Sequence, residues 1–250
     1  MTLLINEIHA INSLHNSFIL NVADRRLTDK DTGEWHGNHR KIFEIPYLNA
    51  GVGYFGVAAV SNEEYFSSWL PNFIKQNANV RSLSQFAHTL RDTLNRTVDK
   101  TFLKDRVSGF HICGYNDERF PEFWIVRNTD RFENGVYRDF KTKYYCDEEF
   151  LKRDARSPDV GYDGVSPVIP GYVRQYYING DIRPFHLIWD ELDKFLYGMF
   201  AFESFSSPKT QTEMEEVAKW KLSVIASFYK KFARRKLIGT PIDAFILLPK

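Results

Sequence analysis

Residues 1–45 read MTLLINEIHAINSLHNSFILNVADRRLTDKDTGEWHGNHRKIFEI, and they hold the clearest strand patterns of the chain. Leu3 to Ile11 is rich in β-branched and aliphatic side chains, residues 12–16 have the composition of a turn, and residues 18–23 are apolar again. A further strand pattern covers residues 40–45. The sequence therefore predicts a long hairpin, then a loop, then a third strand.

Three polar residues mark the joints of these predicted strands: Thr2, Asp24 and Lys41. We expect Met1 to be removed, since initiator removal works when the second residue is small, and Thr2 then carries a free α-amine beside its own hydroxyl. Such an amine can act as the base that activates the hydroxyl. Its ordinary pKa is about 7.7–8.0, and a nearby ammonium lowers that pKa. Lys41 is predicted to supply that ammonium, and Asp24 is predicted to keep Lys41 charged and oriented toward the amine.

The order and spacing of these motifs resemble proteasome β-type subunits, which are N-terminal nucleophile hydrolases. The resemblance rests on Thr2, on the strand that ends at Ala23-Asp24-Arg25-Arg26, on Lys41 opening Lys41-Ile42-Phe43-Glu44-Ile45, and on the glycine-punctuated residues 51–56. We expect no propeptide, which is similar to the bacterial ATP-dependent relative, in which Met removal alone exposes the threonine. The resemblance is clear over about the first quarter of the chain and returns weakly at residues 112–116 and 238–243.

The resemblance implies a four-layer αββα sandwich and a threonine protease that cleaves peptide or amide bonds in a polypeptide substrate. It implies Thr2 as the nucleophile and a backbone amide at Gly56, or at Phe55, as the oxyanion donor. Relatives carry Asp-x-x-Ser-Gly-Gly near the last strand to steady the terminal amine, but this chain has residues 235–240 there. Asp181 is a possible replacement. The resemblance also implies self-association into a ring and, in some relatives, an ATP-driven unfoldase partner.

Two other functions stay open. The missing Asp-x-x-Ser-Gly-Gly favours a catalytically inactive ring-forming or scaffold subunit, and a small-molecule amidase with a private pocket is the third alternative. Each residue also has an ordinary structural interpretation. Asp24 can satisfy a turn at a strand end, Lys41 can be a solvated charge, and Gly56 can serve close packing between a strand and a helix.

Composition limits the class of protein. The chain of 250 residues contains no Pro/Gly/Ser-rich linker, so we expect one domain over residues 1–250. A net charge of +1 argues against a nucleic-acid binder, and apolar runs are too short for a membrane span. Cys113 and Cys146 have no metal or redox spacing, which suits the cytoplasm. We expect no cofactor, and His36 with His39 lacks a third metal ligand.

Along the chain, patterns alternate between strands and helices. Strands are predicted at 48–56, 110–115, 123–127 and 242–248, and helices open at Asn62, at Ser82 or Ser84, at residues 179–181, and at Thr210 or Thr212. The last helix is predicted to stop at Gly239, after the basic run at residues 230–236, which complements a helix dipole. Residues 147–172 show no period and suggest a surface excursion, a lid or a subunit contact. The pattern alone predicts an α+β fold.

Overall fold

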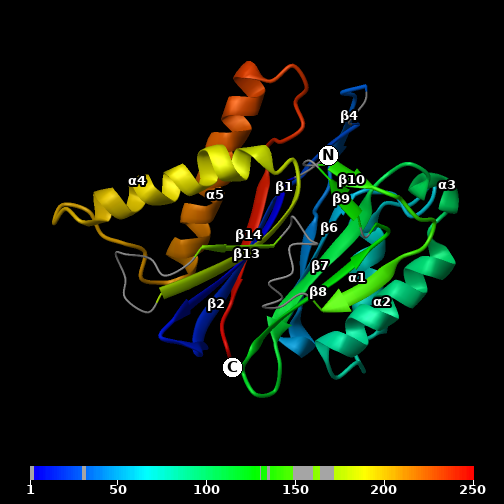
Figure 1. Ribbon diagram of the computed structural model, residues 1–250, viewed down its shortest axis with the longest axis horizontal. Helices are drawn as coiled ribbons and strands as arrows, with labels where there is room; N and C mark the ends of the chain where they lie inside the picture. Colours follow the sequence, from blue (N-terminus) through cyan, green and yellow to red (C-terminus); the bar gives the residue numbers. More distant parts are fainter. Residues whose placement is uncertain (1–2, 30–31, 130, 134–135, 149–159, 164–171) are drawn as a thin grey trace.

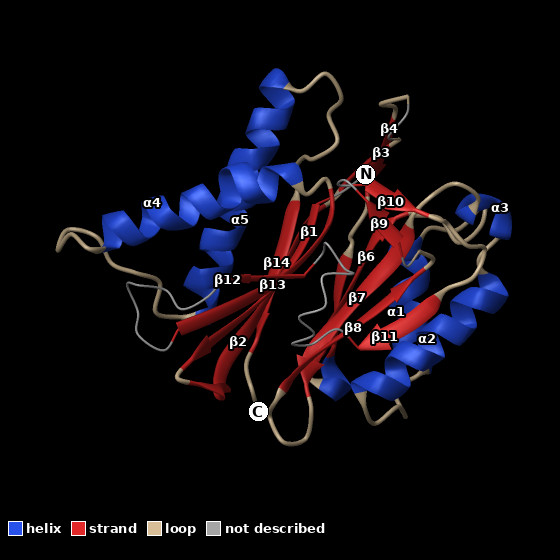
Figure 2. Ribbon diagram, viewed as in Figure 1, coloured by secondary structure: helices blue, strands red, loops and turns tan. Residues whose placement is uncertain are grey.

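The computed structural model describes residues 3–29, 32–129, 131–133, 136–148, 160–163 and 172–250. Within these ranges, helices combine with antiparallel strands in a mixed α/β fold. Figure 1 and Figure 2 show two large sheets, with α1 and α2 along one of them and α5 along the other. The helices are α1 (Phe66–Gln76), α2 (Leu83–Thr97), α3 (Lys100–Leu103), α4 (Asp190–Phe200) and α5 (Gln211–Phe232), with short turns η1 (Pro46–Leu48) and η2 (Phe185–Trp189).

The first sheet has five strands in the order β12-β13-β1-β2-β14, and all of its neighbours are antiparallel. Its central strand is β1. On one side β1 pairs with β2, to which a tight hairpin connects it, and on the other side it pairs with β13, which lies far away in the sequence. The strands are β12 (Val160–Asp163), β13 (Tyr172–Gly180), β1 (Leu3–Ile11), β2 (Ser13–Asp24) and β14 (Ile242–Leu247).

The second sheet also has five antiparallel strands, in the order β11-β8-β7-β6-β5. These strands are β11 (Tyr145–Glu148), β8 (Pro121–Arg127), β7 (Ser108–Tyr115), β6 (Ala50–Gly56) and β5 (Ile42–Ile45). Two ribbons of two strands complete the described part of the chain. They pair β3 (Arg26–Thr28) with β4 (Trp35–Asn38), and β9 (Arg131–Glu133) with β10 (Val136–Arg138).

Strand β1 divides its side chains between two cores, as the alternation of a strand requires. Leu3 and Ile5 pack with α5 and η2 in one apolar cluster, whereas Leu4 and Ile8 pack against strands of the second sheet in another. A third cluster joins the second sheet to α1 and α2 through residues such as Val52, Phe110, Phe66 and Leu90. Each sheet is therefore buried on both faces over its central strands.

The sequence patterns predicted most of these elements, but five differ from the structure. The helix predicted to open at residues 179–181 begins instead with η2 at Phe185, because residues 172–180 pair with β1 as strand β13. The predicted helix at Asn62 begins at Phe66, because Ala59 and Tyr65 first form an isolated β-bridge. The last helix ends at Phe232 rather than at Gly239. Strand β13 and the β3–β4 ribbon were not predicted, since β13 carries buried polar residues that interrupt its apolar pattern.

Between the two sheets lies a row of buried polar side chains on β1, β2, β7 and β13. The neutral ring of His111 is held at both nitrogens: Nδ1 donates to Asn6 Oδ1 at 2.7 Å, and Nε2 accepts from the Asn179 amide at 2.7 Å. Asn6 in turn donates to Asn21 at 2.7 Å, and the Cys113 thiol donates to Asn21 at 3.0 Å. Burial lowers the pKa of His111 to about 3, because the charged ring has no water to solvate it.

This histidine makes stability depend on pH. The unfolded chain binds a proton at His111 below about pH 6.5, while the folded chain stays neutral there down to about pH 3. As the pH is lowered through that window, the free energy of unfolding should therefore decrease, by up to about 1.4 kcal/mol per pH unit from this group. In urea titrations at several pH values, His111→Gln should reduce the slope of the unfolding free energy against pH by the amount that the uptake of about one proton contributes. The exposed control His36→Gln should keep the wild-type slope; equal slopes for His111→Gln and wild type would contradict the assignment.

Candidate active site

Asp24 is the last residue of β2, and its side chain is fully buried. Its Oδ1 accepts the backbone N–H of Leu3 at 3.1 Å and the Lys41 ammonium at 3.2 Å. Its Oδ2 accepts the backbone N–H of Arg26 at 3.1 Å and of Gly239 at 3.3 Å. One carboxylate therefore joins the start of β1, the end of β2, the entry to β5 and the loop that follows α5.

Lys41 lies directly before β5, and its side chain is 1% exposed. Besides Asp24, its ammonium donates to the carbonyl oxygen of Arg26 at 2.6 Å. Removing an ammonium from water costs several kcal/mol, so a buried lysine requires partners of this kind. Burial lowers the pKa of Lys41, and the neighbouring Asp24 carboxylate opposes that shift by favouring the charged form.

The β3–β4 ribbon brings the two residues together. Asp24 turns the chain out of β2 by accepting the N–H two residues ahead, which is the Asx-turn pattern. The ribbon then returns, with Arg26 paired to Asn38 and the N–H of His39 donating to the Arg25 carbonyl at 2.7 Å. Lys41 consequently enters β5 beside the residue from which the ribbon departed.

Thr2, the predicted nucleophile, lies outside the described residues. Its neighbour Leu3 shares the Oδ1 atom of Asp24 with the Lys41 ammonium. Two of the predicted site residues, Asp24 and Lys41, therefore meet at the described beginning of β1, one residue after Thr2.

Gly56 ends β6 in a conformation that requires glycine. Its φ is +78°, and a Cβ added there would lie 2.0 Å from the carbonyl oxygen of Val107. Its strand partner is Ser108, and the described contacts do not join Gly56 to Asp24 or Lys41. Close packing accounts for this glycine, and its predicted role as an oxyanion donor stays a prediction. Phe55, its alternative, is buried in the cluster between the sheets.

Asp181 follows β13, whose residue Gly180 pairs with Leu3. Its carboxylate accepts from Arg183 at 2.8 Å and 2.7 Å and from the hydroxyl of Tyr229. Burial by itself would raise the pKa of Asp181, but the hydrogen bonds from Arg183 and Tyr229 outweigh burial and lower it. Asp181 is therefore an ionised, fully engaged group in the segment that pairs with the start of β1.

Two contributors to this region were not predicted. Gly239, which was interpreted as a helix stop, instead donates its N–H to Asp24. Tyr229 belongs to the buried stripe of α5 and fixes Asp181. Only Tyr229 had a usable signal in the sequence, since a tyrosine within an apolar helical stripe needs a partner for its hydroxyl.

Comparisons with known proteins give weak likenesses. Anbu (ancestral beta-subunit) from Yersinia bercovieri is similar at 13% sequence identity and a TM-score of 0.46, with 98% of this chain and 81% of that chain covered. An Anbu (Gly-1) mutant from Hyphomicrobium sp. strain MC1 is similar at 11% identity and a TM-score of 0.40, with 96% and 79% covered. No family model and no curated protein matches the chain. At these TM-scores the likeness assigns neither a family nor an activity.

The family resemblance drawn from the sequence was therefore wrong as an assignment. The chain is not placed among proteasome β-type subunits, among N-terminal nucleophile hydrolases, or with the propeptide-less bacterial peptidases, because no family model supports it and the structural likeness is weak. The physical reason lies in the motifs. A strand-end aspartate that caps its own turn and a glycine forced by close packing arise in many antiparallel folds.

The described part of the chain offers neither a metal site nor a membrane-spanning helix. There, no group of three or more His, Cys, Asp or Glu residues is arranged to hold a metal ion. No described helix is long and apolar enough to cross a membrane.

The buried pair predicts a distinctive pattern of stability. Lys41→Met should lower the free energy of unfolding by about 3–5 kcal/mol, because Asp24 is left as a buried charge without its cation. The double variant Asp24→Asn/Lys41→Met should recover part of that loss. The exposed pair Glu191–Lys194 provides the control, and Lys194→Met should cost less than about 1 kcal/mol. Urea unfolding checks all three variants, and a Lys41→Met cost as small as that of the control would contradict the arrangement.

Proposed function

We propose that this protein hydrolyses peptide or amide bonds with the hydroxyl of Thr2 as its nucleophile, after removal of Met1. The observation that carries the proposal is the buried Asp24–Lys41 pair at the beginning of β1, where Leu3 and Lys41 donate to the same carboxylate oxygen. A fixed ammonium there is what a terminal amine needs in order to stay neutral and act as a base.

In this mechanism the α-amine of Thr2 takes the proton from its own Oγ, and Oγ attacks the carbonyl carbon of the substrate. The C–N bond then breaks, and the leaving nitrogen receives the proton from the α-amine. Water hydrolyses the resulting ester and regenerates the hydroxyl. Lys41 lowers the pKa of the α-amine by its charge, Asp24 positions Lys41, and a backbone amide near Gly56 stabilises the oxyanion.

Asp181 is proposed to orient the terminal amine from the β13 side, since Gly180 pairs with Leu3 in the first sheet. The same proposal takes residues 1–250 as one domain with a four-layer αββα arrangement. The three apolar clusters support that arrangement, because each sheet contributes residues both to the cluster between the sheets and to a cluster with helices.

A second candidate is a noncatalytic protein in which the same pair is purely structural. One observation favours it: the Asp24 carboxylate already accepts three backbone N–H groups, from Leu3, Arg26 and Gly239, and thereby fixes three chain segments. In that case Lys41 only balances the charge of Asp24.

Covalent labelling separates these two candidates. Intact mass should show the loss of Met1, and a β-lactone or peptide epoxyketone should then add once, at Thr2. Thr2→Ala should abolish the adduct, while the matched variant Thr2→Ser should keep it, since serine also has a hydroxyl beside its amine. Retained Met1, or a processed chain that gives no adduct and no amide hydrolysis, would contradict the enzyme and favour the structural role.

A further inference from the structure

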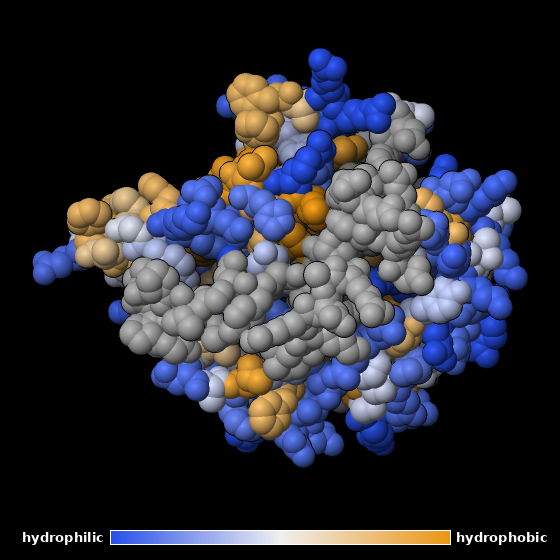
Figure 3. Space-filling model, in the orientation of Figure 1, coloured by the Kyte–Doolittle hydropathy of each residue, from blue (hydrophilic) through white to orange (hydrophobic). Residues whose placement is uncertain are grey.

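Residues 190–217 contain no buried residue, although they include α4, the following loop and the first turns of α5. We call this segment the arm. Four aromatic side chains along it are exposed: Phe195, Tyr197, Phe202 and Phe205. Figure 1 shows α4 running away from the sheets, and Figure 3 shows apolar side chains gathered at that end of the molecule. An exposed apolar surface of this kind marks an interaction site.

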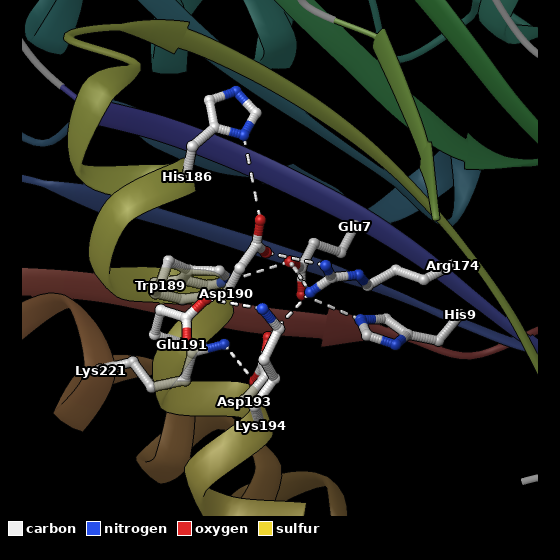
Figure 4. Close-up of polar contacts among 10 residues, drawn as sticks. All are labelled: Glu7, His9, Arg174, His186, Trp189, Asp190, Glu191, Asp193, Lys194 and Lys221. Atoms are coloured by element: carbon white, nitrogen blue, oxygen red, sulfur yellow. Dashed lines mark hydrogen bonds and ion pairs between the residues drawn. The ribbon is translucent and has the colours of Figure 1, made fainter. Parts of the chain in front are cut away.

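The arm is held at its base by ion pairs between its half-buried carboxylates and buried cations, which Figure 4 shows. Arg174 on β13 donates to Asp190 and to Asp193 at 2.8 Å each, and to Glu7 on β1 at 3.2 Å. Lys221 on α5 forms an ion pair with Asp193 and lies 3.7 Å from the ring centroid of Trp189. These bonds fix the root of α4 on the first sheet, so the arm is presented in a set direction.

The charge of the arm limits what can cover it. Apart from Asp190 and Asp193, which pair with Arg174 and Lys221, the arm carries five carboxylates and only two lysines, Lys194 and Lys209. An anionic membrane surface or a nucleic acid would be repelled by this excess of negative charge. The arm therefore fits a partner surface that combines aromatic side chains with positive charge.

Such a surface lies on the same chain, at the other end of α5. Residues 228–236 contain five cations and no acid, and we call them the basic patch. Phe228 and Phe232 are exposed there with ring centroids 5.1 Å apart. Among the described residues, Lys230, Lys231 and Arg234 form no ion pair. Positive charge beyond what the helix dipole needs is thus available beside two exposed rings.

One chain cannot join these two surfaces. They stand at opposite ends of α5, whose 22 residues span roughly 33 Å. We infer that the acidic aromatic arm of one copy docks on the basic aromatic patch of a second copy. This contact is head-to-tail, because it uses two different surfaces, and repetition closes a ring or extends a filament. The inference is independent of the chemistry proposed for Thr2.

Charge reversal on the full chain tests the contact. Wild type should associate in sedimentation velocity, and less so at about 1 M than at about 0.1 M salt, where the Debye length is about 3 Å against about 10 Å. Glu191→Lys/Glu203→Lys/Glu216→Lys reverses the arm, and Lys230→Glu/Lys231→Glu/Arg234→Glu reverses the patch. Each triple variant should weaken self-association at least about tenfold, and the chain with all six changes should regain it.

The restored association distinguishes lost docking from lost folding, because both sets of changes are then present in one chain. Two exposed aromatic residues add a matched apolar control: Phe195 and Trp35 are each 56% exposed. Phe195→Ser should weaken association, whereas Trp35→Ser, on the β3–β4 ribbon, should not. Three results would overturn the inference: a wild-type chain that stays monomeric, a basic-patch reversal that leaves self-association unchanged, or a chain with all six changes that does not regain self-association.

Discussion

The carboxylate of Asp24 connects segments that are far apart in the sequence, and the arrangement around the start of β1 depends on it. It accepts the N–H of Leu3 in the first sheet and the ammonium of Lys41 at the entry to the second sheet. It also accepts the N–H of Gly239, which holds the loop between α5 and β14. A neutral side chain could accept some of these hydrogen bonds, but only an anion balances a lysine that is 1% exposed.

Buried charge meets strand β1 at two places. At its first described residue stands the Asp24–Lys41 pair, and four residues later Glu7 accepts from Arg174 at 3.2 Å and from the Trp189 indole at 2.8 Å. Burial by itself would raise the pKa of Glu7, but Arg174, His9 and Lys221 together outweigh burial and lower that pKa. One strand thus contacts both the Asp24–Lys41 pair and the ion pairs at the root of the arm. The proposed reaction and the proposed contact between copies use separate ends of this framework.

How far the sequence predicts this structure depends on whether the signal is local. The long hairpin was predicted and confirmed, and of the caps predicted at Ser82 or Ser84 and at Thr210 or Thr212 the structure has Ser82 and Thr210, because strand alternation and capping depend on neighbouring residues. Strand β13 was missed because Arg174 and Gln175 have the polarity of surface residues. In the structure both are buried, and Arg174 is paired with Glu7 and with the acids of α4. The pairing of Asp24 with Lys41 was predicted, but the ribbon that makes it possible was not. Gly239 could not be found, since a backbone donor leaves no mark in the sequence.

The most direct test of the buried pair is the titration of the Lys41 ammonium itself. Lysine side chains labelled with an NMR-active nucleus can be followed with pH, and the Lys41→Met spectrum identifies the resonance. The arrangement predicts that Lys41 is charged at neutral pH and loses its proton below the ordinary lysine pKa of about 10.4, because burial lowers its pKa while Asp24 keeps the charged form populated. A Lys41 that titrates at about 10.4 like a solvated lysine would contradict the buried pair, and with it the proposed site.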